Sequence, residues 1–219
     1  MNYKLSQLLN DDTPTKQKIM ICALEQFSTK GYTETSIRDI ATSVGITPGT
    51  IYNHFASKEV IIQNMIDDYI ERTQQMFHNF DIKSVLSKNP TGEGMMICVI
   101  KSVSILAEDV YYSNLVHLIH QEQHRNTIFA NMVLLRLQDT KDFVVRMFDV
   151  LKDLKVIKAD ADAEYCGVIA YMILHMVSVL AAVNIKLSVP GYSMRDLPPI
   201  LKYMFDMALG KYKLLDESV

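Results

Sequence analysis

The chain has 219 residues, of which 49% are hydrophobic and 21% charged, and its formal net charge is −3. This composition is typical of a folded protein, and the net negative charge argues against a general nucleic-acid coat. Eight Gly and six Pro leave little room for a turn-dense β fold. The three Cys are widely spaced within apolar runs, which favours buried reduced thiols over a disulfide framework or zinc site. Helical spacing of apolar residues then predicts an all-α fold of about nine helices.

The first 12 residues are polar and lack the apolar run of a signal peptide, so we expect a cytoplasmic protein. Thr13 and Pro14 fit the cap and first position of a helix that runs to about Thr29. Gly31 fits its end, because glycine accepts backbone conformations that stop a helix. The inner face of this helix is apolar and consists of Ile19, Cys22, Ala23 and Phe27.

Residues 35–59 contain two short helical segments joined by a glycine. Ser36 fits a helix cap, and Asp39 stands three residues on, as in a capping box. Gly45 follows the first segment, and Thr47 and Pro48 fit the cap and first position of the second. Apolar residues of the first segment recur at helical spacing: Ile37, Ile40, Ala41 and Val44. This is the pattern of a helix-turn-helix, whose second helix can enter a DNA major groove.

The flanks of this motif extend the pattern. The matching residues are Ile19, Ala23, Phe27, Gly31, Tyr32, Ser36, Ile40, Ala41, Gly45, Ile46, Thr47, Gly49, Thr50, Ile51, Tyr52, His54, Phe55, Lys58 and Ile61. On these residues the stretch from Lys18 to Ile62 resembles the DNA-binding domain of TetR (tetracycline repressor) family regulators. Ser36 stands where Thr is commoner and keeps the hydroxyl. Beyond this first quarter of the chain, only length and helical character agree with the family.

Geometry assigns DNA-contacting roles within the second segment. Its first turn points into the groove and consists of Thr47, Pro48, Gly49 and Thr50. Asn53 can read a base edge, adenine being its usual partner. The resemblance implies phosphate contacts from Tyr52, His54 and Lys58, and we expect Ser36 and Arg38 to reach the DNA backbone. Alternatively Tyr52 belongs mainly to the core, where we place Phe55.

Charge does not single out this region as a DNA-binding domain. The first 60 residues hold six basic and six acidic side chains, which cancel. Hydroxyls, backbone N–H groups and helix N-termini also bind phosphate, so DNA binding remains the expectation. We expect the protein to bind double-stranded DNA at a palindromic operator.

Ser57 and Glu59 fit the start of a connecting helix over residues 57–80. The following stretch, 81–94, carries Ser, Pro and Gly and predicts irregular structure. We therefore expect a DNA-binding domain over 13–80 and a helical effector-binding and dimerisation domain over 81–219. Further helices are expected over residues 95–107, 110–123, 127–154, 161–187 and 198–210.

Residues 165–185 form an uncharged run of 21 residues, long enough to cross a bilayer. The run is preceded by the acidic residues Asp160, Asp162 and Glu164, and no aromatic-plus-basic anchor flanks it. A helix that is apolar on all sides is also typical of a buried element. The resemblance implies that the last two helices, the eighth and ninth, form a four-helix interface in a homodimer, so we favour a buried dimer helix and expect no membrane.

The family's effector pocket commonly lies among the middle helices, which makes several soft or aromatic side chains candidates as a group. They would suit a small apolar effector with one or two polar anchors. The alternative for each is ordinary core packing. The candidates are Met95, Met96, Tyr111, Phe129, Met132, Met147, Tyr171, Met172 and His175.

His117, His120 and His124 share one face of the helix predicted over 110–123 and its end. Imidazoles there can hold a metal, yet no cysteine or carboxylate stands at ligand spacing, so we expect no metal site and no cofactor.

Phosphate-loop, nucleophile-elbow and zinc-protease motifs are missing, so we expect no enzyme. The leading hypothesis is a homodimeric repressor released from its operator by a small effector. The alternatives are a metal-responsive regulator using these histidines, or a helical carrier or enzyme.

Overall fold

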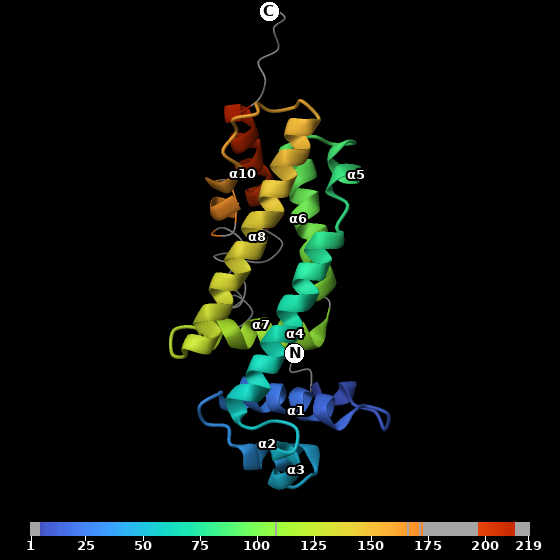
Figure 1. Cartoon of the computed structure of the whole chain (residues 1–219), viewed down its shortest axis with the longest axis vertical. Coiled ribbons are helices and arrows are strands. Elements are labelled where there is room, and N and C mark those ends of the chain that lie inside the picture. The colour runs from blue at the N-terminus through green and yellow to red at the C-terminus, as the bar shows by residue number, and fades with distance from the viewer. Residues whose placement is uncertain (1–4, 108, 166, 171, 173–196, 213–219) are drawn as a thin grey trace, which may run out of the picture. The chain divides into compact units, whose positions relative to one another are not determined.

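The computed structural model describes residues 5–107, 109–165, 167–170, 172 and 197–212 (Figure 1). These residues form helices and contain no strand, which confirms the all-α prediction. Residues 163–165, 167–170 and 172 are also helical. The elements are η1 (Leu5–Leu8), α1 (Thr15–Lys30), α2 (Ile37–Val44), α3 (Pro48–Tyr52), α4 (Lys58–Asn79), α5 (Ile82–Leu86), α6 (Gly92–Ala107), α7 (Val110–Glu122), α8 (Thr127–Asp153) and α10 (Leu197–Tyr212).

The chain divides into two compact units. Unit 1 comprises Met1–Thr73 and Leu106–Val133, and unit 2 comprises Gln74–Ile105 and Leu134–Val219. These units are defined by packing, whereas the division at residue 80 into DNA-binding and effector-binding domains is functional and stays a prediction.

Helix α1 is central to the core of unit 1, where it contacts η1, α2 and α7. The inner stripe predicted for this helix is confirmed, because all four of its side chains are buried. The Tyr32 ring lies edge-on between two phenylalanines, 5.0 Å from Phe27 and 5.2 Å from Phe129 between ring centroids. Such edge-to-face pairs stabilise a core beyond the area they bury, so the residue after Gly31 ties α1 to the start of α8.

Unit 2 has its own aromatic core. The Phe77 and Phe143 rings stack at 4.8 Å between centroids, and α10 buries Phe205 and Leu209. The Arg146 guanidinium donates to the Phe77 carbonyl oxygen at 2.7 Å. Carbonyls in the last turn of a helix lack intrahelical partners, so this bond satisfies the end of α4.

The irregular structure predicted over 81–94 is partly wrong, because residues 82–86 form helix α5. The Asp81 carboxylate accepts the Ser84 N–H at 2.9 Å, which caps the helix. Ile82 and Leu86, one turn apart, are both buried. The Ser, Pro and Gly content of the stretch obscured this short apolar repeat.

Helix ends differ slightly from those expected. The Thr13 hydroxyl donates to Asn10 Oδ1 at 2.9 Å rather than capping α1, whose N-cap position is Pro14 without a side-chain hydrogen bond. Helix α10 continues past Gly210 to Tyr212. Most of the helix expected over 161–187 lies outside the described residues. Among the helices that the structure describes, none is both long and apolar enough to span a bilayer.

Candidate nucleic-acid interface

Helix α2 begins with the predicted capping box. The Asp39 N–H donates to Ser36 Oγ at 3.2 Å, and the Ser36 N–H donates to Asp39 Oδ2 at 2.7 Å. The Lys30 ammonium lies 2.9 Å from the same carboxylate oxygen. The Ser36 hydroxyl also donates to Asp39 Oδ2. This bond, followed by those from the Ser36 N–H and Lys30, holds the pKa of the Asp39 carboxyl well below its usual range. Charge and hydrogen bonds together fix where α2 starts.

Gly45 makes the turn between α2 and α3. Its backbone is left-handed, with φ of 80° and ψ of 31°, and its N–H donates to the Ala41 carbonyl at 3.0 Å. The Ile46 N–H donates to the same carbonyl at 3.0 Å, which closes the helix end. A Cβ at Gly45 would meet nothing within 4 Å. Glycine is therefore required by the backbone conformation and not by crowding.

Helix α3 is short, and its first turn is capped. Thr47 accepts the Thr50 N–H at 3.2 Å and Pro48 occupies the first turn, as predicted. Ile51 is completely buried beneath the helix. The exposed side consists of Thr47, Pro48, Gly49, Tyr52, Asn53 and His54, with Thr50 half-buried.

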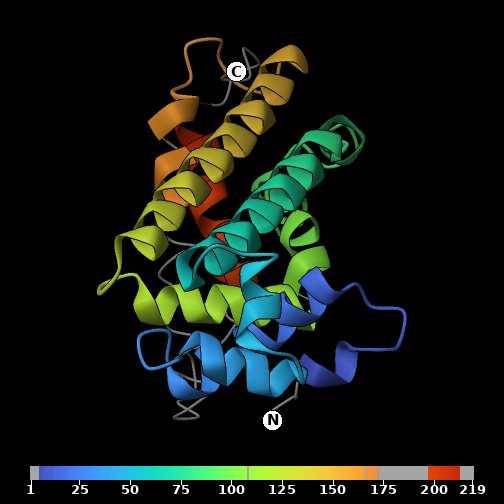
Figure 2. The same ribbon diagram turned by 60° about the horizontal axis from the view of Figure 1, so that its bottom comes forward.

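The two aromatic residues of this region, Tyr52 and Phe55, differ in their exposure to solvent. Tyr52 is 56% exposed, whereas Phe55 is 1% exposed. The ring of Tyr52 is therefore available to a partner, and the core role expected for Phe55 is confirmed. Figure 2 brings α2 and α3 forward at the end of unit 1.

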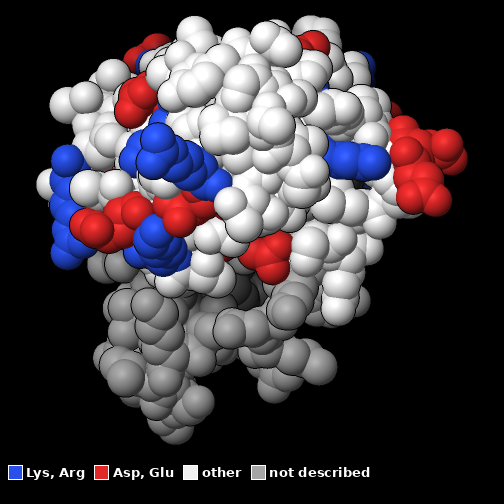
Figure 3. Space-filling view, turned by 90° about the horizontal axis from the view of Figure 1, so that it is seen from below, with Lys and Arg blue, Asp and Glu red and all other residues white. Residues whose placement is uncertain are grey.

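Ser36 and Arg38 are both exposed at the beginning of α2. The face that carries α2 and α3 shows acidic and basic side chains intermixed around a broad uncharged area (Figure 3). This agrees with the charge cancellation in the first 60 residues. Hydroxyls and backbone N–H groups can contact phosphate without a strongly basic surface.

The Lys58 ammonium bonds to the connection between α1 and α2. Its Nζ donates to the carbonyl oxygens of Tyr32 at 2.7 Å, Thr33 at 3.3 Å and Thr35 at 2.9 Å. It also lies 4.5 Å from the centroid of the Tyr32 ring. No local pattern indicates this role, because the bonded residues are 23 to 26 positions away along the chain. A phosphate contact from Lys58 stays a prediction, and it would compete with these bonds.

The effector-pocket candidates are distributed over both units. Phe129 and Met132 are buried in the core of unit 1, and Met95 and Met147 are buried in the core of unit 2. Met96 is half-buried in unit 2, and Met172 is 64% exposed. Tyr171 and His175 lie outside the described residues. Tyr111 lies in unit 1 and lines a cavity there.

Of the three candidate histidines, His117 and His120 lie on α7 and His124 follows its end. The described residues include no group of three or more His, Cys, Asp or Glu side chains placed to hold a metal ion. The His117 ring instead lies 2.7 Å from the Gln121 side-chain amide, between Nε2 atoms. The described geometry therefore does not favour the metal-responsive alternative.

A capped helix, a left-handed glycine and an exposed second helix define a helix-turn-helix DNA-binding domain. Comparison with known proteins agrees. Residues 19–65 match the model of the family described as bacterial regulatory proteins, tetR family. This part of the chain is therefore similar to TetR-family regulators.

The curated relatives are regulators. HTH-type transcriptional regulator UidR of Escherichia coli K12 is 31% identical over 113 residues, which cover 48% of this chain and 56% of UidR. HTH-type transcriptional repressor KstR2 of Mycolicibacterium smegmatis is 34% identical over 65 residues, 27% of this chain and 32% of KstR2. The match to UidR thus spans little more than half of that protein's length.

Solved structures share the fold over nearly the whole chain. Salmonella enterica GusR has a TM-score of 0.61 at 23% identity, covering 92% of this chain and 98% of GusR. SmeT of Stenotrophomonas maltophilia has a TM-score of 0.66 at 18% identity, covering 96% of each chain. At these identities the likeness concerns the fold.

Proposed function

We propose that this protein is a homodimeric, cytoplasmic transcriptional repressor that binds a palindromic operator and is released by a small, largely apolar effector. The observation that carries the proposal is the exposed start of α3 above a buried Ile51. A rigid helix with outward polar groups is what major-groove recognition requires. Regulators among the relatives support the same class.

The DNA-contacting roles follow from position on α2 and α3. Gly49 lets the backbone approach DNA, and the exposed Asn53 is suited to adenine. The hydroxyl of the exposed Tyr52 is suited to a phosphate, as are the groups at the start of α2. In a dimer, two copies of α3 would be roughly 34–36 Å apart, which matches half-sites one duplex turn apart.

Exposed apolar side chains on the last described helix support dimerisation there. Tyr203 is 68% exposed and Met207, one turn further along α10, is 61% exposed. Tyr165 and Met172, in the helical residues that precede the undescribed part, are 59% and 64% exposed. Large apolar side chains gathered on a surface are typical of interaction sites.

An effector would act by linkage. If it binds more tightly to a conformation with a different spacing of the two α3 helices, operator affinity falls by the coupling free energy, typically ~1–3 kcal/mol. A structure of SmeT, a fold relative at 18% identity, contains triclosan. We propose the same class of event here, a small apolar molecule bound by the helices, without proposing triclosan itself.

The decisive experiment is selection of genomic DNA fragments by the purified protein, followed by gel shift on the enriched sequence. We expect a palindromic sequence bound by a dimer. Failure to enrich any sequence over random DNA would remove the proposal.

Two substitutions separate base reading from phosphate binding. Asn53→Ala should relax preference at one base pair, with a loss of about 1–3 kcal/mol on the preferred site only. Tyr52→Phe should weaken binding to all sequences by a similar factor. Gln63→Ala, which removes an exposed amide on α4, is the matched control and should leave binding unchanged. An equal loss for Asn53→Ala on random DNA would contradict its assigned role.

The dimer is tested separately by analytical ultracentrifugation. Met207→Glu should shift the protein toward monomer, because it buries a charge in the proposed interface. Leu134→Glu places the same charge at a comparably exposed residue of α8, 63% exposed, and should leave the dimer intact. Identical behaviour of the two variants would exclude α10 as the interface.

A further inference from the structure

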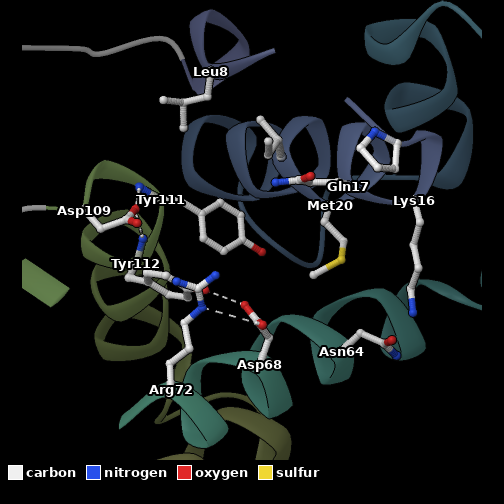
Figure 4. A pocket seen from close by; sticks show the side chains of 12 residues that line it. Leu8, Lys16, Gln17, Met20, Asn64, Asp68, Arg72, Asp109, Tyr111 and Tyr112 are labelled. Carbon is white, nitrogen blue, oxygen red and sulfur yellow. Dashed lines mark hydrogen bonds and ion pairs between the residues drawn. The ribbon is translucent and has the colours of Figure 1, made fainter. Parts of the chain in front are cut away.

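Unit 1 contains a cavity that none of the DNA-binding residues line. It has a volume of about 600 Å³ and is bounded by η1, α1, α4 and the start of α7 (Figure 4). Cavities of this size are within the range that binds small organic molecules. Its apolar wall comes from α1 and η1 and consists of Leu8, Met20 and Ile21.

A buried tyrosine hydroxyl lies at this cavity without a partner. Figure 4 shows the Tyr111 ring at the centre of the view, with its hydroxyl directed between Met20 and Asp68. The oxygen is inaccessible to solvent and makes no hydrogen bond to any described residue. Burial, and then the nearby Asp68 charge, raise the pKa of Tyr111, so the group stays a protonated donor. A buried donor without an acceptor destabilises a protein, and a bound acceptor would remove that penalty.

The two carboxylates of the wall already have partners. The Asp68 carboxylate accepts the Tyr112 hydroxyl at 2.5 Å and lies 3.9 Å from the Arg72 guanidinium. The Asp109 carboxylate accepts the N–H groups of Tyr111 at 2.8 Å and Tyr112 at 3.3 Å, which caps α7. Both carboxylates are thereby engaged within the wall, whereas the Tyr111 hydroxyl makes no bond to any described residue.

Two cations stand at the border of the cavity. Arg72 is exposed, and its guanidinium lies 5.1 Å from the centroid of the Tyr112 ring. Lys16 is exposed on α1, and its ammonium lies 5.5 Å from the centroid of the Phe55 ring. Neither cation is buried, so both can turn toward an anionic ligand group.

We propose that this cavity is a second ligand site, which takes a small molecule with an apolar body and one carbonyl or carboxylate oxygen. The oxygen accepts the Tyr111 hydroxyl, and the apolar body packs on Met20 and Ile21. Lys16 and Arg72 add affinity when the acceptor is a carboxylate.

The site also gives such a ligand a route to DNA binding, a consequence that depends on the proposed function. The cavity wall includes α1, and α1 packs directly against α2. A ligand that joins α1 to α4 and α7 restricts the movement of α1, and with it the start of the helix-turn-helix.

The test uses three probes with one ring system: 2-acetonaphthone, 2-naphthoate and 2-ethylnaphthalene, which carry a ketone, a carboxylate and no acceptor. Calorimetric titration of the full chain without DNA should show the first two binding about fivefold more tightly than the third, the effect of one hydrogen bond. The location is checked by NMR of methyl-labelled methionines. The Met20 methyl should shift, and the Met95 methyl, buried in unit 2, should not.

Tyr111→Phe removes only the hydroxyl and should equalise the three affinities. Its Tm should not fall, because the removed group has no partner among the described residues. Tyr212→Phe removes a tyrosine hydroxyl in unit 2, at a residue that does not line the cavity, and is the matched control. Lys16→Gln distinguishes the two acceptor classes, since it should weaken 2-naphthoate and leave 2-acetonaphthone unchanged.

Each outcome decides for or against the site. Absence of binding by all probes, equal affinities in the unaltered protein, or a shift confined to Met95 would overturn it. These readouts need no DNA, so a failure to find an operator would remove the proposed function and leave the site standing. If an operator is found, saturating 2-acetonaphthone should change operator affinity at least about fivefold, and less in Tyr111→Phe.

Discussion

Helices α2 and α3, here called the α2–α3 tip, and the α1–α4–α7 cavity belong to the same unit. Different kinds of contacts hold them. The bonds that shape the tip join Ser36 to Asp39 and Thr47 to Thr50, each pair three residues apart. The bond from Tyr112 to Asp68 at the cavity joins residues 44 apart. Polar groups at the tip are exposed, whereas the Tyr111 hydroxyl at the cavity is buried.

A small binding surface can be rigid when local contacts hold it. Helix α3 has only five residues, and an isolated helix of that length is unstable in water. Helix caps, a left-handed glycine and one buried isoleucine stabilise this short helix instead. The cavity, by contrast, depends on three helices that long-range packing brings together, so a ligand can alter it.

The largest expected effect comes from the buried side of α3. Ile51→Ala removes a completely buried side chain and should lower the free energy of unfolding by about 2–5 kcal/mol. Chemical denaturation followed by circular dichroism measures the change. Val60→Ala, at a position 37% exposed on α4, is the control and should change it by less than about 0.5 kcal/mol. Similar values for both would show that the tip is held by its caps alone.

The next effect concerns the long-range bonds of Lys58. Lys58→Met keeps the aliphatic stem and removes a charged donor shared by three carbonyl oxygens, so we expect a loss of about 2 kcal/mol in stability. Lys18→Met, which removes a single 3.4 Å bond to the Asp11 carbonyl, should lose much less. Unchanged stability together with weaker DNA binding would mean that the Lys58 ammonium serves phosphate instead.

A smaller effect on stability is expected at Gly45, where the backbone is strained for other residues, than at the positions above. Gly49 provides the comparison, because its backbone imposes no such strain. Gly45→Ala forces a side chain into a left-handed conformation and should destabilise unit 1 by about 1–2 kcal/mol. A Cβ at Gly49 would lie 3.7 Å from Thr47 Oγ1, an ordinary contact. Gly49→Ala should therefore leave stability nearly unchanged and weaken operator binding. Thermal unfolding and gel shift on the same two variants make the comparison, and the reverse pattern would refute it.

The smallest effect is the acid dependence of the capping box. Because the pKa of Asp39 is lowered in the folded protein, its contribution is fully present above the ordinary value of 3.8 and is lost as the pH falls through the lowered value. NMR titration of the carboxyl should show this, and Ser36→Ala should bring the pKa back toward 3.8. A normal pKa in the unaltered protein would mean that the Ser36 bonds do not form in solution.

Sequence reasoning succeeded where structure is local. Ser36, Gly45, Thr47 and Pro48 fixed the helix-turn-helix, because caps and left-handed turns depend on residues within one helical turn of each other. It missed α5, where a helix of five residues is too short for a clear apolar period. It also missed the role of Lys58, whose partners are far away along the chain.

The all-α class and the helix-turn-helix motif could thus be predicted from the residues alone, since each is encoded in neighbouring residues. The residues alone placed Phe55 in the core, but they left Tyr52 open between core and surface, and the packing shows it 56% exposed. Only the packing of α1, α4 and α7 placed the Tyr111 hydroxyl at a cavity wall without a partner among the described residues. The reason is physical, because exposure and cavities depend on which distant helices meet, and spacing along one helix does not specify its neighbours.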